Sequence, residues 1–237
     1  MNKILITNDD GIDSAGIIKL AKAALEVGEV WIVAPDSQRS ACSHSFTFTK
    51  PLKVWEHDIG IEGVHAFACD GTPADCMRVG ILKVVPGGPD YAFSGVNNGL
   101  NICYDVQYSG TVGAAMEGAY FGVHSLAFSQ QDGNEDEVMD RYMLELMKEY
   151  MNKPLTKNQI WNINFPKCSL ADCKGVMRDV KVSRDSFYDD NYSETELEDG
   201  VKQYDVIYKR LWEATPGTDL AAIIDGYVSV GLVNNLG

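Results

Sequence analysis

Basic residues are scarce in this sequence of 237 residues. Lys and Arg together number 20 against 34 Asp and Glu, which gives a formal net charge of −14. Because binding to a phosphate backbone needs clustered Lys and Arg, this balance argues against nucleic-acid polymers and anionic membrane surfaces as partners. A small phosphorylated ligand is compatible with it, since a metal ion and backbone N–H groups can meet the charge of one phosphate.

Long apolar runs are missing as well. No stretch is long enough to span a bilayer, and Asp9 comes too early for the apolar core of a signal peptide. The six cysteines form no Cys-x-x-Cys pair, and the closest two are Cys168 and Cys173. We therefore expect reduced thiols, no zinc site built from cysteines, and a cytoplasmic location.

The first part of the sequence alternates strand-like and helix-like segments. Short continuous apolar runs predict strands, and apolar stripes at helical spacing predict helices. The predicted strands span 4–7, 30–34, 64–69, 91–94, 125–129 and 161–165, and the predicted helices span 14–26, 73–85, 111–121 and 136–151. This alternation indicates an α/β fold: a three-layer, mostly parallel Rossmann-like sheet with helices on both faces.

The pattern changes after about residue 166. Segments 205–208 and 227–230 resemble β-structure, with no helix expected between them. We predict a Rossmann-like core over 1–166 and a smaller extension of β-hairpins over 167–237. Segment 185–199 holds seven acidic residues and no basic one, a composition that predicts a solvated loop of undefined role.

Two adjacent carboxylates follow the first predicted strand, in the turn Asn8-Asp9-Asp10-Gly11. Like charges this close repel each other, and both lose water if the turn is enclosed. A bound divalent cation would offset that cost, and hard oxygen ligands suit Mg²⁺, Mn²⁺ or Ca²⁺. The alternative is a solvated Asp-Gly turn.

Further polar loops follow other predicted strands at the same edge of the sheet, where ligands bind in parallel α/β proteins. Asn97 offers a neutral oxygen ligand, Ser40 a hydroxyl, and Arg39 a fork for a phosphate. His44 has the chemistry of an acid or base but also that of an ordinary surface residue.

The turn Ser109-Gly110-Thr111 opens a predicted helix. It presents free N–H groups and two hydroxyls at the positive end of the helix dipole, which is an anion site for which phosphate is the usual ligand. The same residues would also serve as a simple helix cap through Ser109.

The motifs taken together resemble the SurE family, stationary-phase survival proteins that act as 5′/3′-nucleotidases. The resemblance is carried, in family order, by residues 5–12, 33–40, 71–76, 94–97 and 108–112. Segments 162–166 and 216–229 extend it almost to the end of the sequence. Each block is weak alone, whereas five or more in order are specific.

The resemblance implies a metal-dependent phosphomonoesterase that hydrolyses nucleoside 5′- and 3′-monophosphates and uses one divalent cation, Mg²⁺ or Mn²⁺. Carried over motif by motif, the cation ligands fall on Asp9, Asp10, Ser40 and Asn97, and the phosphate contacts on Asn8, Ser109, Gly110 and Thr111. Asp9 is the first choice for a direct catalytic role, whether as base, ligand only or nucleophile. The family forms dimers or tetramers through its C-terminal extension, so a homodimer or homotetramer is expected.

Other functions also fit part of the sequence. A noncatalytic module that binds a metal or a nucleotide needs the phosphate loop alone. A receiver-like regulatory domain also binds Mg²⁺ through paired acids, but it needs a Lys after its fifth strand, where this sequence has Ser129 and Gln130. A haloacid-dehalogenase-type phosphatase needs Asp-x-Asp after its first strand, and here Asn8 stands in the first of those positions.

Overall fold

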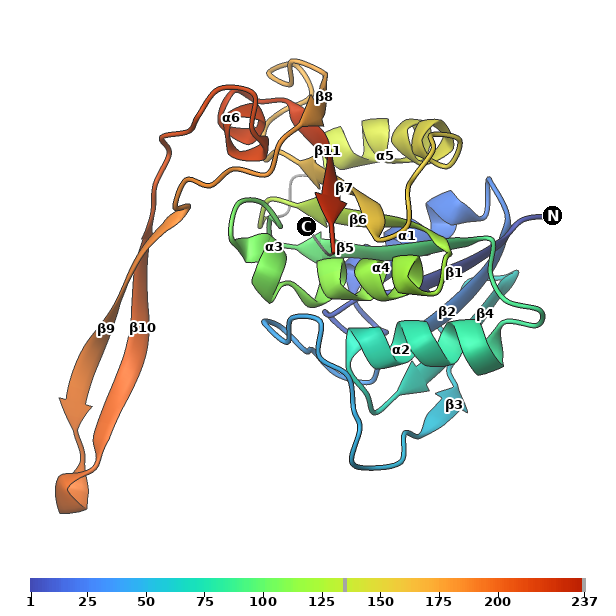
Figure 1. The fold of residues 1–237 in the computed structure, drawn as a ribbon, viewed down its shortest axis with the longest axis horizontal. Coiled ribbons are helices and arrows are strands. Elements are labelled where there is room, and N and C mark those ends of the chain that lie inside the picture. The colour runs from blue at the N-terminus through green and yellow to red at the C-terminus, as the bar shows by residue number, and fades with distance from the viewer. Residues whose placement is uncertain (134–135, 236–237) are drawn as a thin grey trace.

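A nine-stranded sheet runs through the body of the protein (Figure 1). The computed structural model describes residues 1–133 and 136–235. The strands of the sheet are β1 (Lys3–Thr7), β2 (Glu29–Pro35), β3 (Val54–Glu56), β4 (Val64–Cys69), β5 (Tyr91–Asn98), β6 (His124–Gln130), β7 (Gln159–Phe165), β8 (Val176–Val180) and β11 (Val228–Asn234). Their order is β3-β4-β2-β1-β5-β6-β7-β11-β8. All neighbours from β4 to β7 are parallel, whereas β3 and β11 run antiparallel to β4 and β7.

Helices cover both faces of this sheet, as the alternation predicts. They are α1 (Ala15–Ala24), α2 (Pro73–Val79), α3 (Asp105–Tyr108), α4 (Gly110–Tyr120), α5 (Glu137–Tyr150) and α6 (Asp219–Ile224). Ile4 and Ile6 of β1 belong to the core cluster that contains α1 and α5, whereas Leu5 packs in the cluster with α2 and α4. Because successive side chains of a strand point to opposite faces, β1 is buried on both sides, which explains its continuous apolar sequence.

The predicted strands and helices of the first part are confirmed to within a few residues. The predicted helix 73–85 is an α-helix only to Val79 and continues as a π-helical segment over Gly80–Val84. Its start is a reciprocal cap: Thr72 Oγ1 accepts from the Asp75 backbone N–H, and the Asp75 carboxylate accepts from the Thr72 N–H. The three-residue edge strand β3 is an addition to the sequence prediction.

Two predictions for the second part are wrong. No helix is predicted between segments 205–208 and 227–230, but α6 forms there. Thr218 stabilises its first turn by accepting a hydrogen bond from the Ala221 N–H. The acidic segment 185–199 is mostly a strand, β9 (Tyr188–Glu196), which pairs antiparallel with β10 (Lys202–Arg210). Cross-strand contacts compensate for its acidic sequence, among them an ion pair between Lys202 and Glu194 at 2.7 Å.

The β9–β10 hairpin projects away from the rest of the molecule (Figure 1). The other strands after residue 166, β8 and β11, join the main sheet beside β7. The segment 167–237 therefore contributes both to the central sheet and to the projecting hairpin, and the domain boundary at residue 166 stays a prediction. None of the helices in the described ranges has the length and apolar character that crossing a membrane requires.

Candidate functional site

The candidate site lies where the strand order reverses. β1 is flanked by β2 on one side and by β5 on the other, so the chain first builds outward past β2 and then crosses back to β5. In open α/β sheets, ligands bind at the carboxyl ends of the strands at such a switch point. The turn after β1, the loop after β2 and the end of β5 all carry predicted site residues.

Asn8 lies inside the turn after β1 and holds it together. Its Nδ2 donates to the Gly11 carbonyl at 2.9 Å and to Ser14 Oγ at 2.7 Å, while its Oδ1 accepts from the Gly11 N–H at 3.2 Å. Gly11 has a φ of 98°, a conformation that favours glycine. Because both amide hydrogens of the buried Asn8 are used within the protein, the structure gives it the role of shaping the turn, and its contact with a phosphate stays a prediction.

Asp9 is buried against the first turn of α4. Only 4% of the residue is exposed, and its Oδ1 accepts a hydrogen bond from Thr111 Oγ1 at 2.5 Å. A Cβ at Gly110 would lie 2.9 Å from the Asp9 Cβ, so glycine is needed for this close approach. The carboxylate of Asp9 therefore sits at the positive end of the α4 dipole.

The environment of Asp9 suits a cation. The pKa of Asp9 is raised to about 6: burial raises it most, the hydrogen bond from Thr111 partly opposes that rise, and the charge of the neighbouring Asp10 adds to it. Across residues 1–133 and 136–235, no Lys, Arg or His side chain forms an ion pair with Asp9 or Asp10. A divalent ion would supply the missing positive charge.

The other predicted cation ligands bring further oxygen atoms. Asp10 Oδ2 accepts from the Asn98 N–H at 3.0 Å, which ties the turn to the end of β5. Asn97 donates its Nδ2 to the Gly99 carbonyl at 2.8 Å, so its carbonyl Oδ1 is the atom that can coordinate an ion. Ser40 is exposed, and its hydroxyl accepts from Gln38 Nε2 at 2.9 Å.

This donor set fits a hard divalent cation. Two carboxylates, an amide carbonyl and a hydroxyl are the oxygen ligands that Mg²⁺ and Mn²⁺ prefer. No group of three or more His, Cys, Asp or Glu side chains in the described part of the chain could hold a metal ion. An ion at the carboxyl ends of these strands would therefore need neutral oxygen ligands in addition to carboxylates. In the predicted set of Asp9, Asp10, Ser40 and Asn97, the neutral oxygens are those of Ser40 and Asn97.

The start of α4 combines a helix cap with the features of an anion site. Ser109 Oγ accepts from the Val112 N–H at 3.0 Å, which is the capping role that the sequence left open as the alternative. Arg39, the other candidate for a phosphate, instead directs its guanidinium at Asp36, with an Nη2–Oδ1 distance of 3.1 Å.

A buried carboxylate beside the site contacts two partly exposed side chains. Glu117 of α4 is 4% exposed, and its carboxylate contacts His44 Nε2 at 2.8 Å and Arg78 Nη2 at 2.6 Å. Sequence reasoning considered His44 in isolation and missed Glu117 and Arg78. The available signal was a single acidic residue inside the small-residue helical segment 111–121, where a carboxylate is buried only with a partner.

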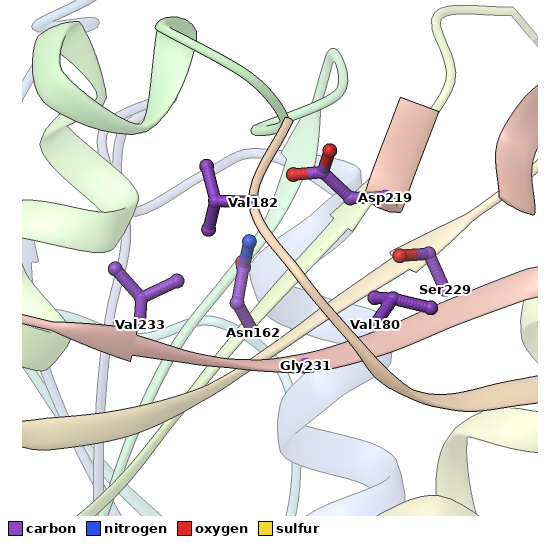
Figure 2. A pocket seen from close by; sticks show the side chains of 7 residues that line it. All are labelled: Asn162, Val180, Val182, Asp219, Ser229, Gly231 and Val233. Atoms are coloured by element: carbon purple, nitrogen blue, oxygen red, sulfur yellow. The ribbon is translucent and has the colours of Figure 1, made fainter. Parts of the chain in front are cut away.

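A small cavity lies away from these residues, between β7, β11 and the segment that follows β8. Figure 2 shows its polar lining, which includes Asn162, Asp219 and Ser229. Within the described residues, Asn162 Oδ1 is buried without a hydrogen-bond partner. The cavity is small and polar, so it suits a buried water rather than a substrate.

The geometry defines a class of protein. It is an α/β protein in which two adjacent carboxylates lie next to the start of a helix, at the carboxyl ends of the strands where the strand order reverses. Residues 4–187 match the family model described as "Survival protein SurE". The chain belongs to the SurE family.

Similar proteins cover almost the whole chain. Proteins named "5'-nucleotidase SurE" from Synechococcus sp. (strain JA-3-3Ab) and from Clostridium botulinum (strain ATCC 19397 / Type A) are each 38% identical, covering 96% of this chain and 89% and 90% of their own lengths. The crystal structure of the SurE protein from Aquifex aeolicus is 34% identical and superimposes with a TM-score of 0.82, covering 98% of this chain and 93% of that one.

Proposed function

We propose that this protein is a nucleotidase, a phosphomonoesterase that hydrolyses nucleoside 5′- and 3′-monophosphates and uses one divalent cation, Mg²⁺ or Mn²⁺. The observation that carries the proposal is the buried Asp9, which lies beside Asp10, contacts Thr111 at the start of α4 and has no ion pair with a basic side chain among the described residues. The name "5'-nucleotidase SurE" of relatives that align over 96% of the chain supports the hydrolysis of nucleoside 5′-monophosphates.

Asp9, Asp10, Ser40 and Asn97 are the residues proposed to hold the cation. When bound there, a divalent cation polarises a phosphoryl oxygen and makes water a stronger nucleophile. The hydrogen bond from Thr111 fixes the orientation of the Asp9 carboxylate, which is proposed to act directly on the reacting groups. Asp10 is held by its bond from the Asn98 N–H, which keeps the second carboxylate in place.

The start of α4 is proposed to bind the phosphate group. The Gly110 and Thr111 backbone N–H groups and the Ser109 hydroxyl lie at the positive end of the helix dipole, where they would hold the non-bridging oxygens and orient the phosphorus for in-line attack. The Thr111 hydroxyl hydrogen is donated to Asp9, so the hydroxyl of Thr111 joins the phosphate site to the cation site. Gly110 lets Asp9 pack closely against this turn, and Asn8 holds the facing turn after β1.

Phosphate release from a panel of nucleoside monophosphates, measured with and without EDTA, tests the proposal. We expect release that EDTA stops and that added Mn²⁺ or Mg²⁺ restores. Nucleotide binding with no phosphate release under any of these conditions would contradict the proposal and favour a noncatalytic binding module.

We propose further that the β9–β10 hairpin joins copies of the chain into a homodimer or homotetramer. The hairpin register places Tyr192 opposite Val206 on one face, which also carries Tyr204 and Tyr208. All four side chains are more than half exposed in the single chain. Asp190 and Glu194 lie opposite Tyr208 and Tyr204, so the face carries a row of exposed aromatic and apolar side chains flanked by carboxylates. Such a row on a projecting element is typical of a protein interface.

We also propose a cytoplasmic location and nucleoside monophosphates as the partners, with neither a nucleic-acid polymer nor a membrane bound. The net charge of −14 and the absence of a Cys-x-x-Cys pair support this assignment.

A further inference from the structure

Glu117 is a buried carboxylate that the proposed chemistry does not use. It lies within α4, and its two carboxylate oxygens face different partners: Oε2 contacts His44 Nε2 and Oε1 contacts Arg78 Nη2. Arg78 is also fixed by aromatic rings, with its guanidinium carbon 4.8 Å from the ring centre of Phe46 and 5.2 Å from that of Phe121. Because Arg78 holds the buried Glu117 carboxylate in place, Glu117 provides a fixed contact for His44 and for the loop that contains it.

His44 belongs to the loop that carries Ser40. This loop lies directly on α4 and the residues before it: the Ser43 N–H donates to the Tyr108 carbonyl at 2.9 Å, and Ser43 Oγ donates to the Gln107 carbonyl at 2.6 Å. A Cβ at Gly113 would lie 2.7 Å from the Ser43 carbonyl oxygen. The loop and the helix are therefore in backbone contact, and His44 extends this contact along α4 to Glu117.

The backbone of the loop needs such support. Ala41 and Ser43 have φ values of 56° and 57°, in the left-handed region that residues with a side chain rarely adopt. A strained conformation of this kind persists only where surrounding contacts hold it. Ser40 immediately precedes the first of these residues, so the position of its hydroxyl depends on the contacts that keep the loop on α4. On the other side, the Arg39 N–H donates to the Asp9 carbonyl at 2.7 Å.

We propose that His44 and Glu117 are positioning residues for Ser40, and that their contact sets the affinity of the rim for its divalent cation. The proposal rests on the function proposed above, because it takes Ser40 as a cation ligand. His44 acts through the loop and not on the substrate, since its Nε2 is directed at Glu117. His44 is then neither an acid or base nor an ordinary surface residue, but holds the loop.

The test is a double-mutant cycle read by Mn²⁺ affinity without substrate, measured by isothermal titration calorimetry. The proteins are the unaltered chain, His44→Ala, Ser40→Ala and the double variant. Each single variant should bind Mn²⁺ roughly 10-fold more weakly, since removing the support of a ligand typically costs that much in affinity. The double variant should bind no more weakly than Ser40→Ala, because His44 has no further ligand to position.

Two controls separate positioning from general stability. His44→Gln keeps an N–H group that can reach Glu117, so Mn²⁺ affinity should return to within about 3-fold of the unaltered chain. His65→Ala removes another histidine that faces a glutamate, Glu29 at 3.7 Å, at the amino ends of β4 and β2, and it should leave the affinity unchanged. The thermal midpoint of each variant is recorded beside its affinity.

Unchanged Mn²⁺ affinity in His44→Ala, or losses that multiply in the double variant, would overturn the proposal. Absence of Mn²⁺ binding by the unaltered chain would overturn both this proposal and the metal-dependent function. If the cycle behaves as expected but no nucleoside monophosphate is hydrolysed, only the proposed reaction fails, since the binding measurement needs no turnover.

Discussion

Asp9 is the residue on which the proposed chemistry depends most. Replacing it with Asn keeps the size of the side chain but removes one carboxylate from the proposed cation site. We expect Asp9→Asn to lower kcat for nucleoside monophosphates by roughly 10²- to 10³-fold. Because the carboxylate is buried and no basic side chain in the described part of the chain pairs with it, the metal-free variant should melt no lower than the metal-free unaltered protein. Phosphate-release kinetics and circular dichroism measure the two effects, and full activity in the variant would contradict the assignment.

Gly110 permits the contact between Asp9 and α4. An alanine Cβ there would lie 2.7 Å from Cys42 Sγ and 2.9 Å from the Asp9 Cβ. We expect Gly110→Ala to lower the free energy of unfolding by about 1–3 kcal/mol and to reduce activity strongly. Adding Cys42→Ala should restore part of the stability, measured by urea unfolding, but not the activity, because the clash with Asp9 remains. Full recovery of activity in the double variant would argue against a role for this close approach.

At the scale of elements, the carboxylate of Asp105 in α3 lies in an unfavourable place, partly buried and near Asp190 of the hairpin. The pKa of Asp105 is raised to about 6, mainly by burial and in addition by the nearby Asp190 of β9, while Arg210 lowers it in part. Since this pKa is higher in the folded than in the unfolded chain, protonation of Asp105 stabilises the fold. That stabilisation is complete below about pH 4 and is lost as the pH rises through 6.

Asp105→Asn should therefore raise the thermal midpoint by a few degrees at pH 7, and the difference from the unaltered protein should vanish near pH 4. Asp190→Asn removes the neighbouring charge and should shift the pH dependence of stability toward lower pH. Melting curves between pH 4 and 8 measure both effects, and a gain in Asp105→Asn that is the same at every pH would exclude this explanation.

The elements show which parts of the fold are encoded locally. Buried parallel strands and amphipathic helices carry their patterns within a few residues, so β1, β2 and α5 follow from the sequence alone. The hairpin does not, because β9 looks like a solvated acidic segment until the partner strand supplies Lys202 and the tyrosines. The helix α6 spans only six residues, which is too short for a periodic pattern.

The candidate site divides in the same way. The paired acids, the glycine turn and the start of α4 could be found because each is a short motif after a strand or before a helix. Their meeting follows from the general rule that loops gather at the carboxyl ends of parallel strands. The contact between His44 and Glu117 joins residues 73 positions apart and has no local signal. Only packing reveals that Asn8 turns inward and that Arg39 pairs with Asp36.

At the scale of the whole molecule, two neighbouring residues of β10 lie on opposite faces of the hairpin, so each face can be altered by itself. Val206 lies on the tyrosine-bearing face and is 60% exposed, whereas Ile207 lies on the opposite face and is 50% exposed. We expect Val206→Glu to dissociate the oligomer, because it places a charge in the proposed apolar interface, and Ile207→Glu to leave it intact. Light scattering coupled to size-exclusion chromatography measures the mass of each. Equal effects of the two substitutions would contradict an interface on one face.

The position of β11 has a consequence for the order in which the sheet forms during synthesis. β11 lies between β7 and β8, although it follows both of them in the sequence. While the ribosome is still translating the hairpin, β7 can already join the growing sheet, but in the described part of the chain β8 pairs with β11 alone and must wait for residues 228–234. Until then, side-chain contacts such as the ion pair between Arg178 of β8 and Glu149 of α5 hold the segment against the core, and β11 then adds the backbone hydrogen bonds.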